Sequence, residues 1–121
     1  SNLRRLTQMY IMASEFSSAV EPAERLTELA DDGESWDYLG YIHLMNRDYE
    51  SAVEAMQTAL QRGGLENQGD VQLSLARALV ELDRFDEAEA AARAAQNLGV
   101  DNAQQFLSYI ESSKNRYETL Q

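Results

Sequence analysis

The sequence predicts an all-α fold, an α-solenoid of antiparallel helix pairs that ends in a C-terminal capping helix. Three observations lead to this prediction. The 121 residues include only one proline and six glycines, so residues that interrupt helices are rare. A short motif recurs along the chain at intervals close to the length of one helix pair. After Asp101, one amphipathic pattern runs almost to the end of the chain.

An aromatic residue followed three positions later by alanine marks the second helix of each predicted pair. The motif occurs as Phe16-Ser-Ser-Ala19, Tyr49-Glu-Ser-Ala52 and Phe85-Asp-Glu-Ala88. The steps from Ala19 to Ala52 and from Ala52 to Ala88 are 33 and 36 residues. An amphipathic segment precedes each copy: Leu3, Leu6 and Tyr10, then Trp36, Leu39, Gly40 and His43, then Gln72, Leu75, Ala76 and Leu79. The pattern indicates consecutive helix-turn-helix units.

These units and the last helix account for the whole chain as a single domain over residues 1–121. The first unit covers about residues 1–32 and is clipped, the second about 33–66 and the third about 69–100. The capping helix covers about residues 101–119, with Ala103, Phe106, Leu107 and Ile110 on its apolar side. Because the helical pattern already runs at Leu3, we expect the sequence to be a fragment of a longer chain.

The helix ends carry residues typical of caps. Ser18 with Glu21 and Asp86 with Glu89 have the spacing of a capping box, which places a helix start at each serine or aspartate. Asp48 and Asp101 are expected to cap two further helices, and Pro22 is expected in the first turn of its helix.

Gly40 is unusual, because glycine inside a helix costs about 1 kcal/mol. The repeat explains it if the paired helices approach closely at Gly40, Ala52, Ala76 and Ala88, where only small side chains fit. Trp36 and Leu39 are expected to fill the space beside the glycine.

The charge narrows the choice of partner. Ten basic and 21 acidic residues give a net charge of −11, which repels nucleic acid and anionic lipid. A neutral or basic protein or peptide is favoured. The sequence contains no cysteine and no apolar stretch of the roughly 20 residues that a membrane span needs, so we expect no direct membrane insertion.

The sequence predicts no catalytic, metal-binding or cofactor-binding residues, and therefore a protein that is not an enzyme. His43 is the only histidine and stands at the position of Tyr10 in the first unit and Leu79 in the third, so we assign it to packing. The run Asp31-Asp32-Gly33-Glu34 lacks the alternating aspartates and the distal glutamate of a calcium loop. We interpret it as an acidic loop that caps a helix.

The inner face of the solenoid, formed by the first helix of each pair, is the predicted site of function. Leu44, Leu73 and Val80 on this face are expected to fill the core between repeats. The candidates for a partner-binding groove are Arg4, Gln8, Met12, Asp37, Tyr41, Met45, Arg77 and Glu81.

The second unit, with Trp36, Leu39, Gly40, Tyr49, Ala52 and Ala59 in place, resembles the tetratricopeptide repeat (TPR), whose pattern is W-x2-L-G-x2-Y followed by A-x3-F. It departs from the pattern at His43, Met56 and Gly64. The resemblance implies a TPR-type solenoid that scaffolds protein complexes by holding a peptide or helix in its groove. The TPR clamp for chaperone tails is absent, because its Lys, Asn and Arg positions carry Arg4, Gln8, Tyr38, Asp70 and Ser74.

Roughly residues 55 to 115, which include the runs A-L-Q-R-G-G-L and F-L-S-Y-I-E-S, are also similar to the C-terminal part of bacterial TPR proteins associated with TonB, ExbB and ExbD systems. This likeness implies a periplasmic setting, with the cytoplasm as the alternative. Two hypotheses about function stay open. The chain is either an adaptor that binds a protein segment, or a structural spacer that self-associates as part of a longer solenoid.

Overall fold

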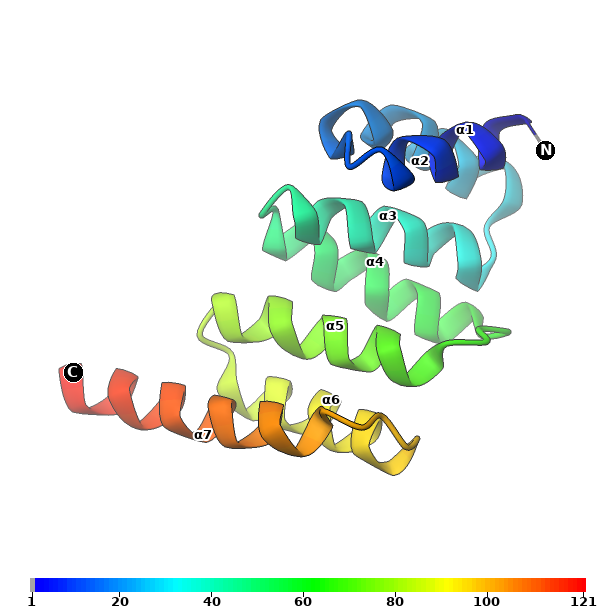
Figure 1. The fold of residues 1–121 in the computed structure, drawn as a ribbon. Helices are drawn as coiled ribbons and strands as arrows, with labels where there is room; N and C mark the ends of the chain where they lie inside the picture. Colours follow the sequence, from blue (N-terminus) through cyan, green and yellow to red (C-terminus); the bar gives the residue numbers. More distant parts are fainter. Residues whose placement is uncertain (1) are drawn as a thin grey trace. The chain divides into compact units, whose positions relative to one another are not determined.

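The computed structural model describes residues 2–121, and every regular element in that range is a helix (Figure 1). The helices are α1 (Asn2–Met12), α2 (Phe16–Ala30), α3 (Gly33–Met45), α4 (Tyr49–Arg62), α5 (Gln68–Glu81), α6 (Phe85–Asn97) and α7 (Ala103–Leu120). Helices adjacent in sequence pack as α1 with α2, α3 with α4 and α5 with α6. The predicted fold class, an all-α array of antiparallel pairs of the solenoid type, is confirmed.

The helices form two compact units. The first contains α1 to α4 and ends at Glu66, and the second is Asn67–Gln121 with α5 to α7. Within the first unit α2 also packs on α3, and within the second α7 packs on α6 and α5. None of the helices formed by residues 2–121 is both long enough and apolar enough to cross a membrane.

The turn inside each pair has the same backbone geometry, which shows the repeat independently of side chains. Ser14, Arg47 and Asp83 have φ values of 57°, 63° and 58°, the left-handed conformation that ends many helices. In each turn the next N–H donates to a carbonyl five residues earlier, over 2.9 Å from Glu15 to Tyr10, from Asp48 to His43 and from Arg84 to Leu79. The local turn therefore recurs with the period read from the alanines.

The four small residues lie where the sequence predicts close contact. Gly40 is buried, and a Cβ there would lie 2.7 Å from Met56 Cγ and 3.3 Å from the Met56 nitrogen. Ala52, Ala76 and Ala88 have no exposed surface. The reason given for a glycine inside α3 is confirmed.

A second glycine, Gly33, has even less space. As the first residue of α3 it packs on the end of α4, where an added Cβ would lie 2.2 Å from the Gly63 carbonyl oxygen. Backbone atoms cannot yield as a flexible side chain can, so this contact fixes how α3 starts beside the end of α4.

Trp36 packs beside Leu39 as expected, but it is only partly buried. Its ring packs against the core cluster that contains Ala23, Leu39 and Ala55. Its Nε1–H donates to the Asp31 carboxylate over 2.7 Å, so one edge of the indole stays at the surface. A polar edge of this kind needs a partner or water.

Two predicted helix starts, at Ser18 and Asp86, are wrong, and the one at Asp48 is right. Asp48 accepts a hydrogen bond from the Ser51 N–H over 3.4 Å and caps α4 as predicted. However, α2 and α6 begin at their aromatic residues, Phe16 and Phe85, and the residues before them make no side-chain cap. The recurrent turn sets these starts, so the motifs at Ser18 and Asp86 lie inside the helices.

Two further expectations about helix ends are also wrong. Pro22 lies in the interior of α2 and not in its first turn, so the carbonyl of the exposed Ser18 lacks its helical partner. Asp101 is not the cap of α7, because Asn102 precedes the helix and makes no side-chain cap.

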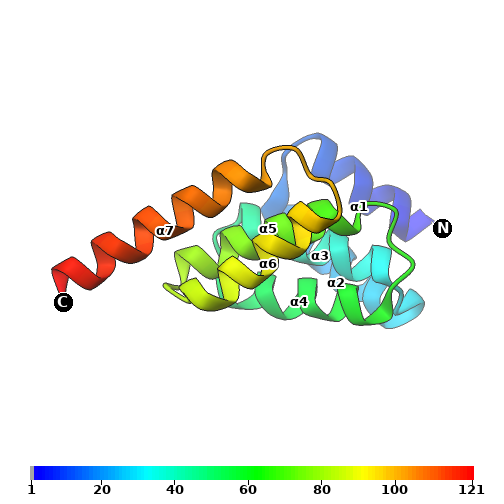
Figure 2. The same ribbon diagram turned by 90° about the horizontal axis from the view of Figure 1, so that it is seen from below.

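Helix α7 has its apolar side against the rest of its unit, as predicted for a capping helix. Ala103 and Ile110 are buried, Phe85 and Tyr117 lie with ring centres 5.5 Å apart, and Lys114 Nζ bonds Asp86 over 3.1 Å. The last turns of α7 extend beyond α6 (Figure 2).

We predict that Gly33→Ala lowers the free energy of unfolding by about 2 kcal/mol and that Gly40→Leu lowers it by at least about 1 to 3 kcal/mol, because both overpack the contact between α3 and α4. Urea unfolding followed by circular dichroism measures the change. Gln57→Ala, at an exposed position of α4, is the matched control and should change stability by less than about 0.5 kcal/mol. If both glycine variants unfolded at the wild-type urea concentration, the close-contact argument would be refuted.

Candidate functional site

Six of the eight predicted groove residues lie on two neighbouring helices of the first unit. We call them the α1–α3 face: Arg4, Gln8 and Met12 on α1, and Asp37, Tyr41 and Met45 on α3. Each set is spaced by four residues, which places its members in one row along the helix. Helices α1 and α3 are in contact, so the two rows belong to neighbouring helices.

Polar contacts join α1 to α3 on this face. Gln8 Nε2 donates to the Tyr38 hydroxyl over 2.7 Å. Arg4 pairs with the carboxylates of Glu34 and, over 3.3 Å, Asp32. Tyr38 was not among the predicted groove residues. It follows Asp37 directly, and neighbouring residues of a helix point about 100° apart, so only its contact with α1 shows that it belongs to this face.

The other end of the face is apolar and exposed. Met12, Tyr41 and Met45 have 85%, 37% and 39% of their surface exposed. The Tyr41 ring packs edge-on against Phe16, with ring centres 5.9 Å apart, so the Phe16 ring holds the Tyr41 ring in place. An exposed tyrosine packed on Phe16, together with exposed methionines on α1 and α3, is a surface suited to contact with another polypeptide.

The remaining two groove residues lie in the second unit, one turn apart on α5. Arg77 and Glu81 are both exposed, and the Arg77 guanidinium lies 5.9 Å from the centre of the Phe106 ring on α7. Leu44, Leu73 and Val80, which were expected in the core, are buried.

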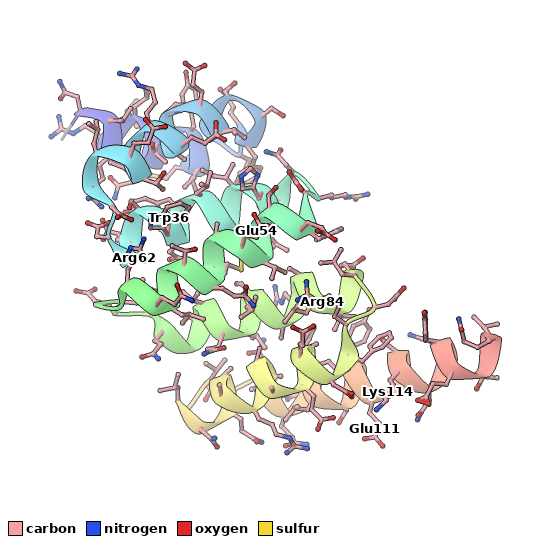
Figure 3. The ribbon with its side chains drawn as sticks, turned by 180° about the vertical axis from the view of Figure 1, so that it is seen from behind. Trp36, Glu54, Arg62, Arg84, Glu111 and Lys114 are labelled. Carbon is pink, nitrogen blue, oxygen red and sulfur yellow. The ribbon has the colours of Figure 1, made fainter. Side chains whose placement is uncertain are left out.

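A pocket of about 650 Å³ opens on the other side of the first unit. Helices α2 and α4 form its walls and α3 its floor, and we call it the α2–α4 pocket. Figure 3 shows Trp36 and Arg62 close together, with Glu54 further along α4. The lining includes Glu24 and Glu28 from α2, Trp36 and His43 from α3, and Glu54 and Arg62 from α4. Sequence reasoning missed this pocket because it assigned Trp36 and His43 to packing alone.

Asp31 closes one end of the α2–α4 pocket. Its Oδ1 accepts hydrogen bonds from Trp36 Nε1–H over 2.7 Å and from Arg62 Nε–H over 3.0 Å. These donors, Trp36 above all, hold the pKa of the Asp31 carboxyl below its usual value. Asp31 therefore stays ionised and joins the ends of α2, α3 and α4.

Asp32 caps α3 in a capping box that sequence reasoning anticipated only as a general capping role. Its Oδ1 accepts from the Ser35 N–H over 2.8 Å, and the Ser35 hydroxyl accepts from the Asp32 N–H over 3.2 Å. The bond from the Ser35 backbone is the main reason that the pKa of Asp32 is lowered. The carboxylate form is thus the form that stabilises the start of α3.

His43 lies half-buried on α3, with Nδ1 at 3.8 Å from the Asp48 carboxylate. No three His, Asp or Glu side chains among residues 2–121 are placed to hold a metal ion.

The comparison with protein families gives a match to a repeat family. The family model described as tetratricopeptide repeat matches residues 43–108, slightly more than half of the 121 residues. This range begins inside α3 and ends inside α7. No curated protein matches the chain.

We predict that Asp32→Ala lowers the free energy of unfolding at pH 7 by about 1 kcal/mol, because α3 loses its cap. The pKa of Asp32 is lowered in the folded protein, so its contribution is present above about pH 4, the value for an unfolded chain, and is lost as the pH falls further. The difference between variant and wild type should therefore shrink below about pH 4. Urea unfolding at several pH values measures it.

Glu111→Ala on the exposed side of α7 is the control and should leave stability within about 0.5 kcal/mol of wild type. A stability difference for Asp32→Ala that stays constant down to pH 2 would contradict the assignment.

Proposed function

Because the chain belongs to the tetratricopeptide repeat family, whose repeats are generally protein–protein interaction modules, we propose that it is a non-enzymatic adaptor that binds a peptide or helical segment of a partner. In the proposal the segment lies on the α1–α3 face. The observation that carries it is that three apolar side chains of this face, Met12, Tyr41 and Met45, are exposed.

The chemistry of the face supports a protein segment as the ligand. Tyr41 offers a rigid aromatic surface held by Phe16, and the two methionines adapt to the shape of a ligand at low cost. Asp37, one turn before Tyr41 on α3, adds a carboxylate to the same row. With the net charge of −11, this favours a neutral or basic segment with apolar anchors.

The setting that we propose is an envelope transport complex linked to TonB, ExbB and ExbD. It rests on the likeness of residues 55 to 115 to the repeat proteins of those systems. Arg77 and Glu81 are proposed as further contacts with the partner, on the strength of their register in α5.

We predict that Tyr41→Ala combined with Met45→Ala weakens binding of a selected peptide by at least about tenfold, since two central anchors are lost. The peptide is obtained by display selection against the wild-type protein, and its dissociation constant is measured by fluorescence anisotropy. Tyr109→Ala on α7, where the tyrosine is 47% exposed, is the matched control and should bind as wild type does. Equal affinity of all three proteins would refute the assignment of the face.

A pull-down with the wild-type protein as bait tests the proposed link to the TonB, ExbB and ExbD complex. ExbB, ExbD or TonB should be retained from an envelope extract by the wild type and not by a Tyr41→Ala, Arg77→Glu variant. If the wild type retains none of them, the envelope proposal fails and the peptide-binding proposal still stands.

The alternative is a spacer that self-associates, and the exposure of Leu6 (39%) and Met9 (60%) on α1 favours it. These residues are three apart and share one side of the helix. If they form a contact between copies, light scattering will show a mass that rises with concentration. Leu6→Glu combined with Met9→Glu should then return the mass to that of a monomer. A constant monomer mass for the wild type would exclude this alternative.

A further inference from the structure

The α2–α4 pocket contains three carboxylates that the described part of the chain does not neutralise. Glu24 and Glu28 line it from α2, and Glu54 lines it from α4. Among residues 2–121 no ion pair includes any of the three. Glu24 and Glu28 are four residues apart, so like charges lie next to each other on one helix, an arrangement that costs stability.

The one arginine that lines the pocket is already engaged. Arg62 is bound by Asp31 over 3.0 Å. Because α3 runs antiparallel to both α2 and α4, Asp31, Trp36 and Arg62 lie at one end of the pocket. Residues earlier in α2 and α4, and later in α3, lie toward the other end, where Glu24 is found. Negative charge is therefore balanced at the Arg62 end and unbalanced beyond it.

Apolar side chains from α3 and α4 line the inner part of the pocket. Leu39 and Ala55 are nearly buried, with 6% and 3% of their surface exposed, and the Trp36 ring lines the pocket beside them. A lysine or arginine side chain matches this arrangement, because its methylene groups pack on apolar surface while its charge reaches carboxylates. The indole adds a face to which cations are attracted.

The size of the pocket accommodates a short peptide segment. Its volume of about 650 Å³ lies within the range usual for ligand sites. Along α2 the lining runs from Glu24 to Asp31, a rise of about 10 Å, which is the length of about three extended residues.

We propose that the α2–α4 pocket is a second docking site, which receives lysine or arginine side chains from a basic segment of a partner protein. The pocket and the α1–α3 face share only one helix, α3. Within α3, different residues line the two sites. The adaptor would then hold two segments at once, an apolar one on the α1–α3 face and a basic one in the pocket, and the two sites would add to each other in overall affinity. This inference rests on the proposed function as an adaptor.

The test uses an acetylated and amidated pentalysine peptide as the probe and the fluorescence of Trp36 as the signal. Trp36 is the only tryptophan and lines the pocket, so its emission reports on the site directly. We expect a saturable change in the wild type. We expect the triple variant Glu24→Gln, Glu28→Gln, Glu54→Gln to bind the probe about tenfold more weakly. It loses three surface ion pairs with the peptide, each of which contributes a few-fold to affinity.

A matched variant controls for overall charge. Glu15→Gln, Glu21→Gln and Glu50→Gln remove the same charge from exposed positions of the same unit outside the pocket, and should change affinity by less than about twofold. Equal losses in the two triple variants would show general attraction to an acidic protein and overturn the proposal. So would a wild type that gives no saturable change.

Two further measurements distinguish a docked protein segment from a free polyamine, and the pocket from the α1–α3 face. Spermidine should bind much more weakly than pentalysine, and equal affinity would make the pocket a site for free polyamines and overturn docking of a protein. The Tyr41→Ala, Met45→Ala variant should bind pentalysine as wild type does, which separates this test from that of the α1–α3 face.

Thermal melts verify that the variants are folded. If the triple variant is unfolded, Glu54→Gln alone replaces it, with an expected loss of affinity of about twofold to threefold.

Discussion

The close approach of α3 and α4 is the constraint on which the first unit depends. At Gly40 the helices meet with no room for a Cβ beside Met56, and at Gly33 the backbone of α3 lies against the Gly63 carbonyl. Because these two contacts lie at different positions along α3, they fix both the distance and the crossing angle between α3 and α4. The stability that glycine loses in a helix is offset by this packing, because the apolar side chains around Leu39 and Ile42 then close into one core.

This packing gives the two sides of the first unit different chemistry. Helices α1 and α3 present the rows that end in Met12 and Met45, and the end of that surface with Met12, Tyr41 and Met45 exposes apolar side chains. Helices α2 and α4 instead place glutamates over a floor made by α3. Since both surfaces use α3, a change in the spacing of α3 and α4 would alter both.

Acidic side chains have two separate roles in this unit. Asp31 and Asp32 accept hydrogen bonds from Trp36, Arg62 and Ser35, and these bonds keep their pKa values low. They hold helix ends in place. Glu24, Glu28 and Glu54 form no such bonds to the described residues, so their charge is available to a ligand. Acidic residues thus serve structure at one end of the pocket and, in the docking site that we propose, recognition along the rest of it.

The sequence by itself determined the helix pairs, their period and the small residues at Gly40, Ala52, Ala76 and Ala88, because periodic packing leaves a periodic pattern in the chain. It also indicated which residues of α1 and α3 share a face, since a step of four residues is a property of any helix. Only the tertiary structure decided where α2, α6 and α7 start, because Ser18, Asp86 and Asp101 have suitable local chemistry but the turns before the helices set their first residues. The half-exposed Trp36, the contact of Gln8 with Tyr38 and the α2–α4 pocket likewise depend on how separate helices meet, and distances between helices are not encoded in the spacing within one of them.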